Sequence, residues 1–179
     1  MRKFNMILTM GILLLVLIHG IMGAFGLFGA NANALKVVAR VAATLIAVHV
    51  VLTTILTIQT CRARKKAGAG YFKENRLFWT RRITGFTILI PLYMHLMIFM
   101  EQSGEAYRLR EFTTGRMISQ ILLVLTLALH ILTNVRPALI GFGVKGRKAI
   151  LADAVFFLSV MLLIFAVAFF IYYLRWIRL

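Results

Sequence analysis

The sequence predicts an all-α integral membrane protein with five transmembrane helices. Of its 179 residues, 61% are hydrophobic and 15% are charged, a balance far more apolar than that of soluble domains. The apolar residues fall into five runs of about 18 residues or more, long enough for a helix to cross a bilayer. Short basic segments separate these runs, as in the loops of membrane proteins. The formal net charge of +16 therefore indicates membrane loops, and we expect no nucleic-acid partner.

The first two spans are expected at about 4–28 and 35–60. A basic start, an apolar run and the small residues 30–34 also resemble a secretory signal peptide. The run is longer than a usual signal core, so we expect it to be retained as a span. The second span ends in the basic sequence Cys61-Arg-Ala-Arg-Lys-Lys66. Because Cys61 is the only cysteine, the chain cannot build a disulfide framework or a cysteine-based metal site.

The third span is expected at about 83–100. The polar stretch before it, up to Thr80, is expected to be a loop or a short surface helix. Its aromatic residues are placed to lie at the membrane interface: Tyr71, Phe72, Phe78 and Trp79.

The fourth and fifth spans are expected at about 117–135 and 150–174, after a polar loop at 101–115. Pro137 is expected to end or kink the fourth span, because proline lacks an N–H and disfavours helix at the residue before it. No internal repeat or linker separates a second domain, so residues 1–179 are expected to form a single transmembrane domain.

The basic residues are divided unequally between the two membrane sides. With the N-terminus inside, 14 of the 21 lysines and arginines fall on the inner side and 7 on the outer side. The positive-inside rule therefore favours a cytoplasmic N-terminus and an outer C-terminus. The inner set is Arg2, Lys3, Arg62, Arg64, Lys65, Lys66, Lys73, Arg76, Arg81, Arg82, Arg136, Lys145, Arg147 and Lys148. The outer set is Lys36, Arg40, Arg108, Arg110, Arg116, Arg175 and Arg178.

Four of the five spans carry one histidine each: His19, His49, His95 and His130. An ionisable residue inside a membrane segment is costly to keep and indicates a functional site. At a rise of ~1.5 Å per residue, His19 and His95 lie roughly 20–24 Å from the inner boundary on outward-running helices. His49 and His130 lie roughly 20 Å from the outer boundary on inward-running helices. In a hydrocarbon core ~30 Å thick, this predicts two layers, His19 with His95 and His49 with His130.

Two imidazoles that face each other across a helical core are the ligand set of a six-coordinate haem. We therefore expect two haems b, with His19 and His95 on the iron of the outer haem and His49 and His130 on the iron of the inner haem. Arg81 and Arg82 are candidates to contact the anionic propionates. Small residues near the macrocycle are available at Gly11, Gly20, Gly23 and Gly85.

Two plainer interpretations of the histidines compete with haem ligation. An intramembrane histidine often makes a hydrogen bond between helices or belongs to a proton path. A zinc site is disfavoured, because the two layers are too far apart to share an ion and no Cys, Asp or Glu lies beside them.

With these residues in view, the chain resembles the dihaem cytochrome b anchors of succinate dehydrogenases and quinol:fumarate reductases. The most specific local match is Asn75-Arg-Leu-Phe-Trp-Thr-Arg-Arg-Ile-Thr-Gly85, an aromatic and Thr-Gly entry ten residues before His95. The likeness extends over essentially the whole chain, and that family pairs its first ligand with its third and its second with its fourth. One departure is Ala128, where some members carry a glutamate linked to proton movement.

The resemblance implies the partners and the reaction. A flavoprotein and an iron–sulfur protein on the cytoplasmic face would interconvert succinate and fumarate, and this chain would exchange the electrons with a quinone, expected to be menaquinone. No catalytic residue for the dicarboxylate reaction is expected in this chain. The expected location is the inner membrane of a bacterial or archaeal cell.

Three alternatives stay open. The chain could be the cytochrome b subunit of a formate dehydrogenase or hydrogenase, although those often place two ligands on one helix. It could be a stand-alone reductase resembling cytochrome b561, which would need no soluble partner. It could also be a small transporter or assembly factor without haem, with its histidines in packing roles.

Overall fold

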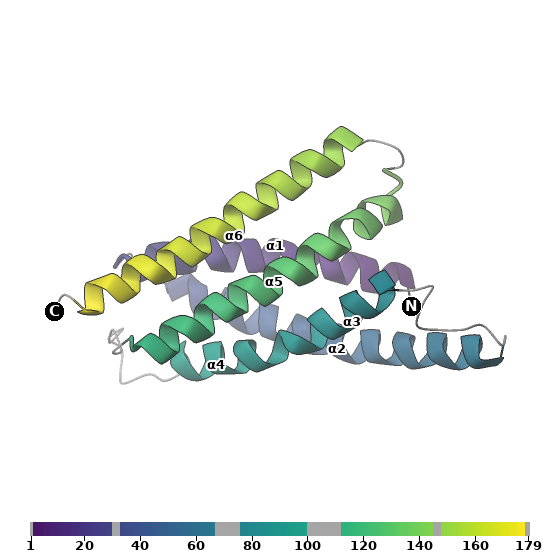
Figure 1. Cartoon of the computed structure of the whole chain (residues 1–179), viewed down its shortest axis with the longest axis horizontal. Helices are drawn as coiled ribbons and strands as arrows, with labels where there is room; N and C mark the ends of the chain where they lie inside the picture. Colours follow the sequence, from purple (N-terminus) through teal and green to yellow (C-terminus); the bar gives the residue numbers. More distant parts are fainter. Residues whose placement is uncertain (1, 30–32, 67–75, 100–111, 145–147, 178–179) are drawn as a thin grey trace. The chain divides into compact units, whose positions relative to one another are not determined.

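A computed structural model describes residues 2–29, 33–66, 76–99, 112–144 and 148–177 (Figure 1). The described residues form helices and no strand, which confirms the predicted all-α class. Within these described residues, five stretches of helix are long and apolar enough to cross a membrane, so the chain is a multi-pass membrane protein. The helices are α1 (Arg2–Leu27), α2 (Asn33–Lys66), α3 (Arg76–Thr87), α4 (Leu89–Phe99), α5 (Thr114–Gly141) and α6 (Lys148–Ile177).

Helices α3 and α4 together make the third span, and they are separated at Ile88. Pro91 explains the interruption, because it has no N–H to donate to the carbonyl of Thr87 and its ring crowds that carbonyl. The backbone bonds on either side continue, from Ile88 N–H to the carbonyl of Thr84 and from Leu92 N–H to the carbonyl of Ile88. The break is therefore local, and the polypeptide continues as one membrane span.

Several helices extend beyond the predicted spans, most clearly in the third and fourth. The third span begins at Arg76, so Phe78 and Trp79 belong to the first turns of α3 and not to a loop or a separate surface helix. Their sequence holds no glycine or proline before Gly85, so nothing local stops the helix from continuing to Arg76. Tyr71 and Phe72 lie outside the described residues.

The fourth span is longer than predicted at both ends. Helix α5 begins at Thr114, where the side chain of Thr113 accepts a hydrogen bond from the N–H of Arg116 as an N-cap. It continues through Pro137 to Gly141, so the proline does not end the helix. Only one backbone bond is lost at such a proline, and the bonds of the neighbouring turns hold the remaining residues in helix.

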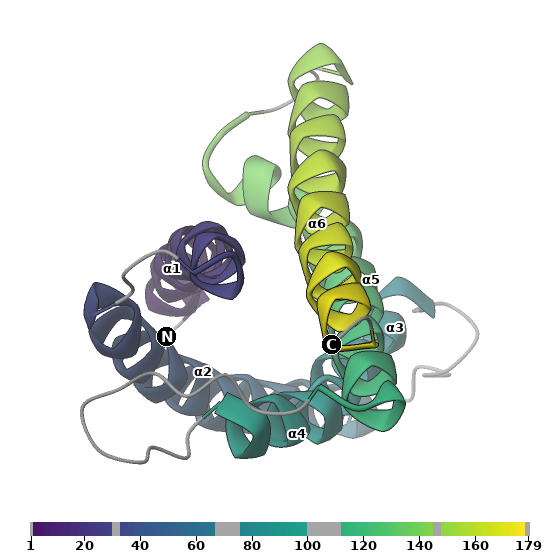
Figure 2. The ribbon, with the colours of Figure 1, turned by 90° about the vertical axis from the view of Figure 1, so that its left-hand side faces the viewer.

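The chain divides into two compact units, Met1–Arg76 and Leu77–Leu179, and each is described by itself. In the second unit α5 packs against both α4 and α6 (Figures 1 and 2). The buried residues of α6 recur every three or four positions, which places them on one helical face. They are Leu158, Leu162, Phe165, Ala168 and Tyr172.

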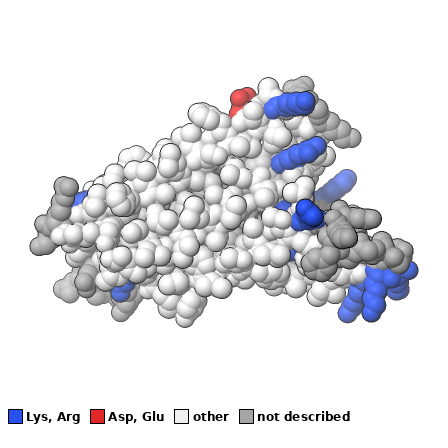
Figure 3. Space-filling model, in the orientation of Figure 1, with Lys and Arg blue, Asp and Glu red and all other residues white. Residues whose placement is uncertain are grey.

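In the first unit α1 packs against α2. Few of its described side chains are buried; the apolar ones are Leu35 and Ala42. Large apolar side chains instead cover the outer surface of both units, for example Phe4, Ile90 and Phe156. On the face shown in Figure 3, lysine and arginine side chains gather toward the helix ends. Apolar flanks with charged ends are the surface that a lipid bilayer requires. Which membrane side each terminus faces stays a prediction.

Candidate functional site

His95 of α4 is held by a directional chain of hydrogen bonds from α5. The hydroxyl of Ser119 donates to the backbone carbonyl of Arg116 at 2.7 Å, so its oxygen is left to accept. The amide nitrogen of Gln120 donates to that oxygen at 3.0 Å, which turns the amide oxygen toward His95. Nδ1 of His95 lies 2.6 Å from this amide oxygen. Because a carbonyl oxygen can only accept, Nδ1 of His95 carries the proton.

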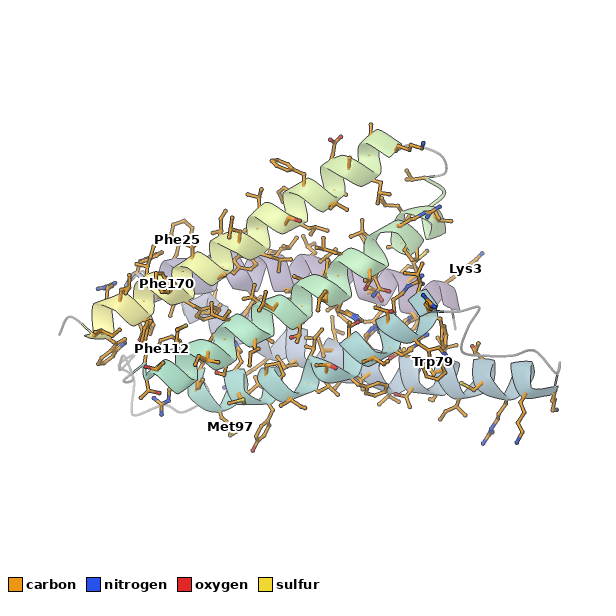
Figure 4. All side chains as sticks on the ribbon, in the orientation of Figure 1. Lys3, Phe25, Trp79, Met97, Phe112 and Phe170 are labelled. Atoms are coloured by element: carbon orange, nitrogen blue, oxygen red, sulfur yellow. The ribbon has the colours of Figure 1, made fainter. Side chains whose placement is uncertain are left out.

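The His95 ring is also enclosed by aromatic side chains. Phe99 of α4 lies 5.0 Å away between ring centroids, and Phe169 of α6 meets the imidazole edge-on at 6.4 Å. Phe169 in turn stacks on Phe112, the buried residue just before α5 that Figure 4 labels. Three helices therefore restrict the orientation of this imidazole.

His49 of α2 is oriented in the same way by α1. Its Nδ1 lies 3.1 Å from the side-chain oxygen of Asn5 and 3.4 Å from the hydroxyl of Thr9. Thr9 already donates its proton to the backbone carbonyl of Asn5 at 2.7 Å. Both neighbours of Nδ1 are therefore acceptors, so this nitrogen is again the protonated one.

His130 of α5 faces the beginning of the third span. Its Nδ1 lies 3.2 Å from the hydroxyl of Thr84, which donates its own proton to the carbonyl of Thr80 at 2.8 Å. With its proton given to that carbonyl, the hydroxyl oxygen is left to accept from Nδ1, and the backbone of Arg81 lies close to the ring. Gly85 permits the close approach of the His130 ring to α3, because a Cβ there would lie 3.0 Å from Cε1 of His130.

The three hydrogen-bonding patterns have one chemical consequence. In a neutral imidazole one ring nitrogen donates and the other carries a lone pair. With Nδ1 committed as a donor in His49, His95 and His130, the lone pair lies on Nε2 in each ring. A partner that accepts from one ring nitrogen and thereby fixes the tautomer is the arrangement found behind metal-ligating histidines. All three side chains are half-buried on their helices.

His19 is half-buried on α1. The two expected haem pairs each combine one histidine of Met1–Arg76 with one of Leu77–Leu179. The pairing of His19 with His95 and of His49 with His130 therefore stays a prediction. Among the residues that the structure describes, no three His, Cys, Asp or Glu side chains converge as a metal-binding group.

Arg81 and Arg82 both lie near His130, Arg81 with its backbone and Arg82 with its side chain. The backbone of Arg81 lies close to the ring, and the charge of Arg82 is near enough for an electrostatic interaction with it. The guanidinium of Arg82 also lies 5.0 Å above the ring of Phe78, a cation–π distance. Both arginine side chains are half-buried in α3, about one turn before Gly85. Arg81 and Arg82, the predicted propionate contacts, thus lie beside His130, one of the predicted haem ligands.

The sequence interpretation missed the residues that orient the histidines: Asn5, Thr9, Ser119 and Gln120. A local signal exists for Gln120, because a side-chain amide in the apolar run of α5 is costly unless it is hydrogen bonded. Gln120 is 0% exposed and Ser119 is 2% exposed, and they are the two buried polar side chains among the described residues. Asn5 and Thr9 gave no such signal, because they stand at the start of the first span.

Comparisons with models of known protein families, with curated protein sequences and with solved structures find no match to this chain.

Proposed function

We propose that this chain is a haem b subunit of a membrane-bound quinone oxidoreductase, of the succinate dehydrogenase or fumarate reductase type. The observation that carries the proposal is the shared orientation of His49, His95 and His130, each with Nδ1 donating to an oxygen and the lone pair on Nε2. Histidines that serve only as helix-to-helix hydrogen bonds need no common tautomer. Three histidines that share one tautomer are better explained by a common need for a basic Nε2.

The residues present fit a haem b. His19 and His95 would ligate one iron and His49 and His130 the other, while Arg81 and Arg82 supply positive charge for propionates beside His130. Gly85 leaves room for the His130 ring against α3. When bound, a haem with two imidazole ligands supplies a one-electron carrier that has no open position for oxygen.

This chain's own residues would then contribute three things. Asn5, Thr84 and Gln120 hold the imidazoles in the ligating tautomer. The apolar helices exclude water from the haems. The basic ends of α1, α2 and α3 offer a positive surface to the cytoplasmic iron–sulfur and flavoprotein subunits. Quinone, expected to be menaquinone, would exchange electrons within the membrane.

The haem content of the purified chain tests this proposal. A pyridine haemochrome assay is expected to give two haems b per chain, and the reduced-minus-oxidised spectrum is expected to be that of low-spin b-type haem. One haem per chain would reject the two-layer arrangement. A chain without haem would leave the histidines as interhelical hydrogen bonds of a non-haem membrane protein.

Co-purification then separates the haem-based alternatives. Flavoprotein and iron–sulfur subunits that interconvert succinate and fumarate should accompany the chain when it is isolated from its membrane in mild detergent. Partners with formate dehydrogenase or hydrogenase activity would indicate the second kind of complex. A haem-loaded chain without any soluble partner would favour the stand-alone reductase.

A further inference from the structure

Gln120 differs from the other histidine partners in its burial and in how firmly it is held. It is 0% exposed, whereas Asn5 and Thr84 are half-buried. Its amide is fixed by Ser119, which is itself fixed by the carbonyl of Arg116. The bond to His95 measures 2.6 Å, compared with 3.1 Å from Asn5 to His49 and 3.2 Å from Thr84 to His130. A hydrogen bond to a fully buried acceptor, in surroundings of low dielectric constant, is stronger than the same bond in water.

The direction of this bond determines what it can do to a ligand. When Nδ1–H donates to a strong acceptor, electron density shifts toward Nε2 and the ring becomes a more basic ligand. A more basic ligand stabilises the more highly charged, oxidised iron, so the midpoint potential falls. The same bond sets the rotation of the ring, together with Phe99 and Phe169.

We propose that Gln120 is the positioning residue of the His95 haem, which it holds at a lower midpoint potential by fixing the tautomer and raising the basicity of His95. This inference rests on the proposed function, since it requires a haem on His95. Gln120 does not touch the iron; it acts through the imidazole. Ser119 supports it by keeping the amide oxygen turned toward His95.

The test is a spectroelectrochemical titration of the purified, haem-loaded chain. The component that disappears in His95→Ala identifies the haem under study. Gln120→Leu removes the acceptor at similar volume, so the midpoint of that component should rise and the haem should be retained about 10–100-fold more weakly. Ser119→Ala should shift the midpoint in the same direction by less, because the amide loses its anchor but not its oxygen.

Gln120→Glu keeps an oxygen at the same place and makes it ionisable. The midpoint of the His95 haem should then depend on pH, with lower values above the titration of the new carboxyl, because a carboxylate is the stronger acceptor. The matched control is Val124→Ala on the same helix, a buried residue that contributes packing but no hydrogen bond to His95. It should leave the midpoint unchanged.

The outcomes separate the two proposals. A wild-type chain without haem overturns the proposed function and this inference with it. A haem-loaded wild type whose midpoint is unaltered in Gln120→Leu overturns the inference alone. If Gln120→Leu loses the His95 haem, recovery of that haem in Gln120→Glu supports the positioning role. Loss in both variants, with retention in Val124→Ala, overturns it.

Discussion

Gly85→Ala should displace His130 and weaken the haem that it is proposed to bind. The added methyl carbon would lie 3.0 Å from Cε1 of His130 and 3.4 Å from its Nδ1. Carbon atoms in favourable contact are about 3.5–4.0 Å apart, so the ring has to retreat by about 0.5 Å or more. The bond from Nδ1 to Thr84 already measures 3.2 Å, and this retreat would take it beyond hydrogen-bonding distance.

The effect should be larger on the site than on the fold. Overpacking a well-filled position costs about 1–3 kcal/mol, whereas replacing a helical glycine by alanine returns about 1 kcal/mol of helix propensity. The net loss in unfolding free energy is thus at most about 2 kcal/mol. A displaced and unsupported ligand, in contrast, is expected to weaken haem binding about 10–100-fold.

The assay is the haem content of the purified variant, measured together with its low-spin spectrum during stepwise removal of haem. Gly115→Ala is the matched control, because no described atom lies within 4 Å of a Cβ built there. It should keep both haems. A Gly85→Ala chain that retains both haems as firmly as the control would refute the argument that the space beside His130 matters.

Three further predictions follow from the same arrangement. His49→Ala and His130→Ala should each remove the same haem, and absorption difference spectra that show different haems lost in the two variants would reject their pairing. Changing Arg64 and Lys65 together to Glu should weaken association with the soluble subunits while membrane insertion continues, because many basic residues remain; an unchanged complex in size-exclusion chromatography at moderate salt would contradict a docking role. If the quinone site lies near the outer haem, turnover in proteoliposomes should respond to an imposed membrane potential, because a charge that crosses the membrane changes in energy by ~2.3 kcal/mol per 100 mV. A turnover rate that does not change with the potential would place the quinone chemistry on the inner side or require compensating protons.

The spans were predictable because their signal is local. Any stretch of about 20 apolar residues must satisfy its backbone inside the bilayer by forming a helix, whatever its neighbours are. The ends were less predictable, as α3 and α5 show. Arg76 to Thr80 follows a polar stretch and was predicted to belong to it, yet these residues are part of α3, because hydrophobicity marks where lipid begins and not where backbone hydrogen bonds end.

The two prolines show a related limit. Pro137 was expected to end or kink its helix, and α5 does not end there but continues to Gly141. For Pro91 there was no expectation, and it accompanies the break at Ile88. Both remove one backbone bond. The sequence around each proline does not say whether the helix continues past it, because the turns on either side and their packing against neighbouring helices decide this.

The sequence by itself determined that four histidines stand in four membrane spans, because the cost of an ionisable side chain in hydrocarbon depends only on its own segment. The tertiary structure alone decided which ring nitrogen carries the proton. The acceptors come from other helices, as Gln120 of α5 does for His95 and Asn5 of α1 does for His49. No local pattern fixes the register between two helices. That register is set by side-chain packing along the length of the helices. It determines whether Nδ1 and its acceptor come within hydrogen-bonding distance.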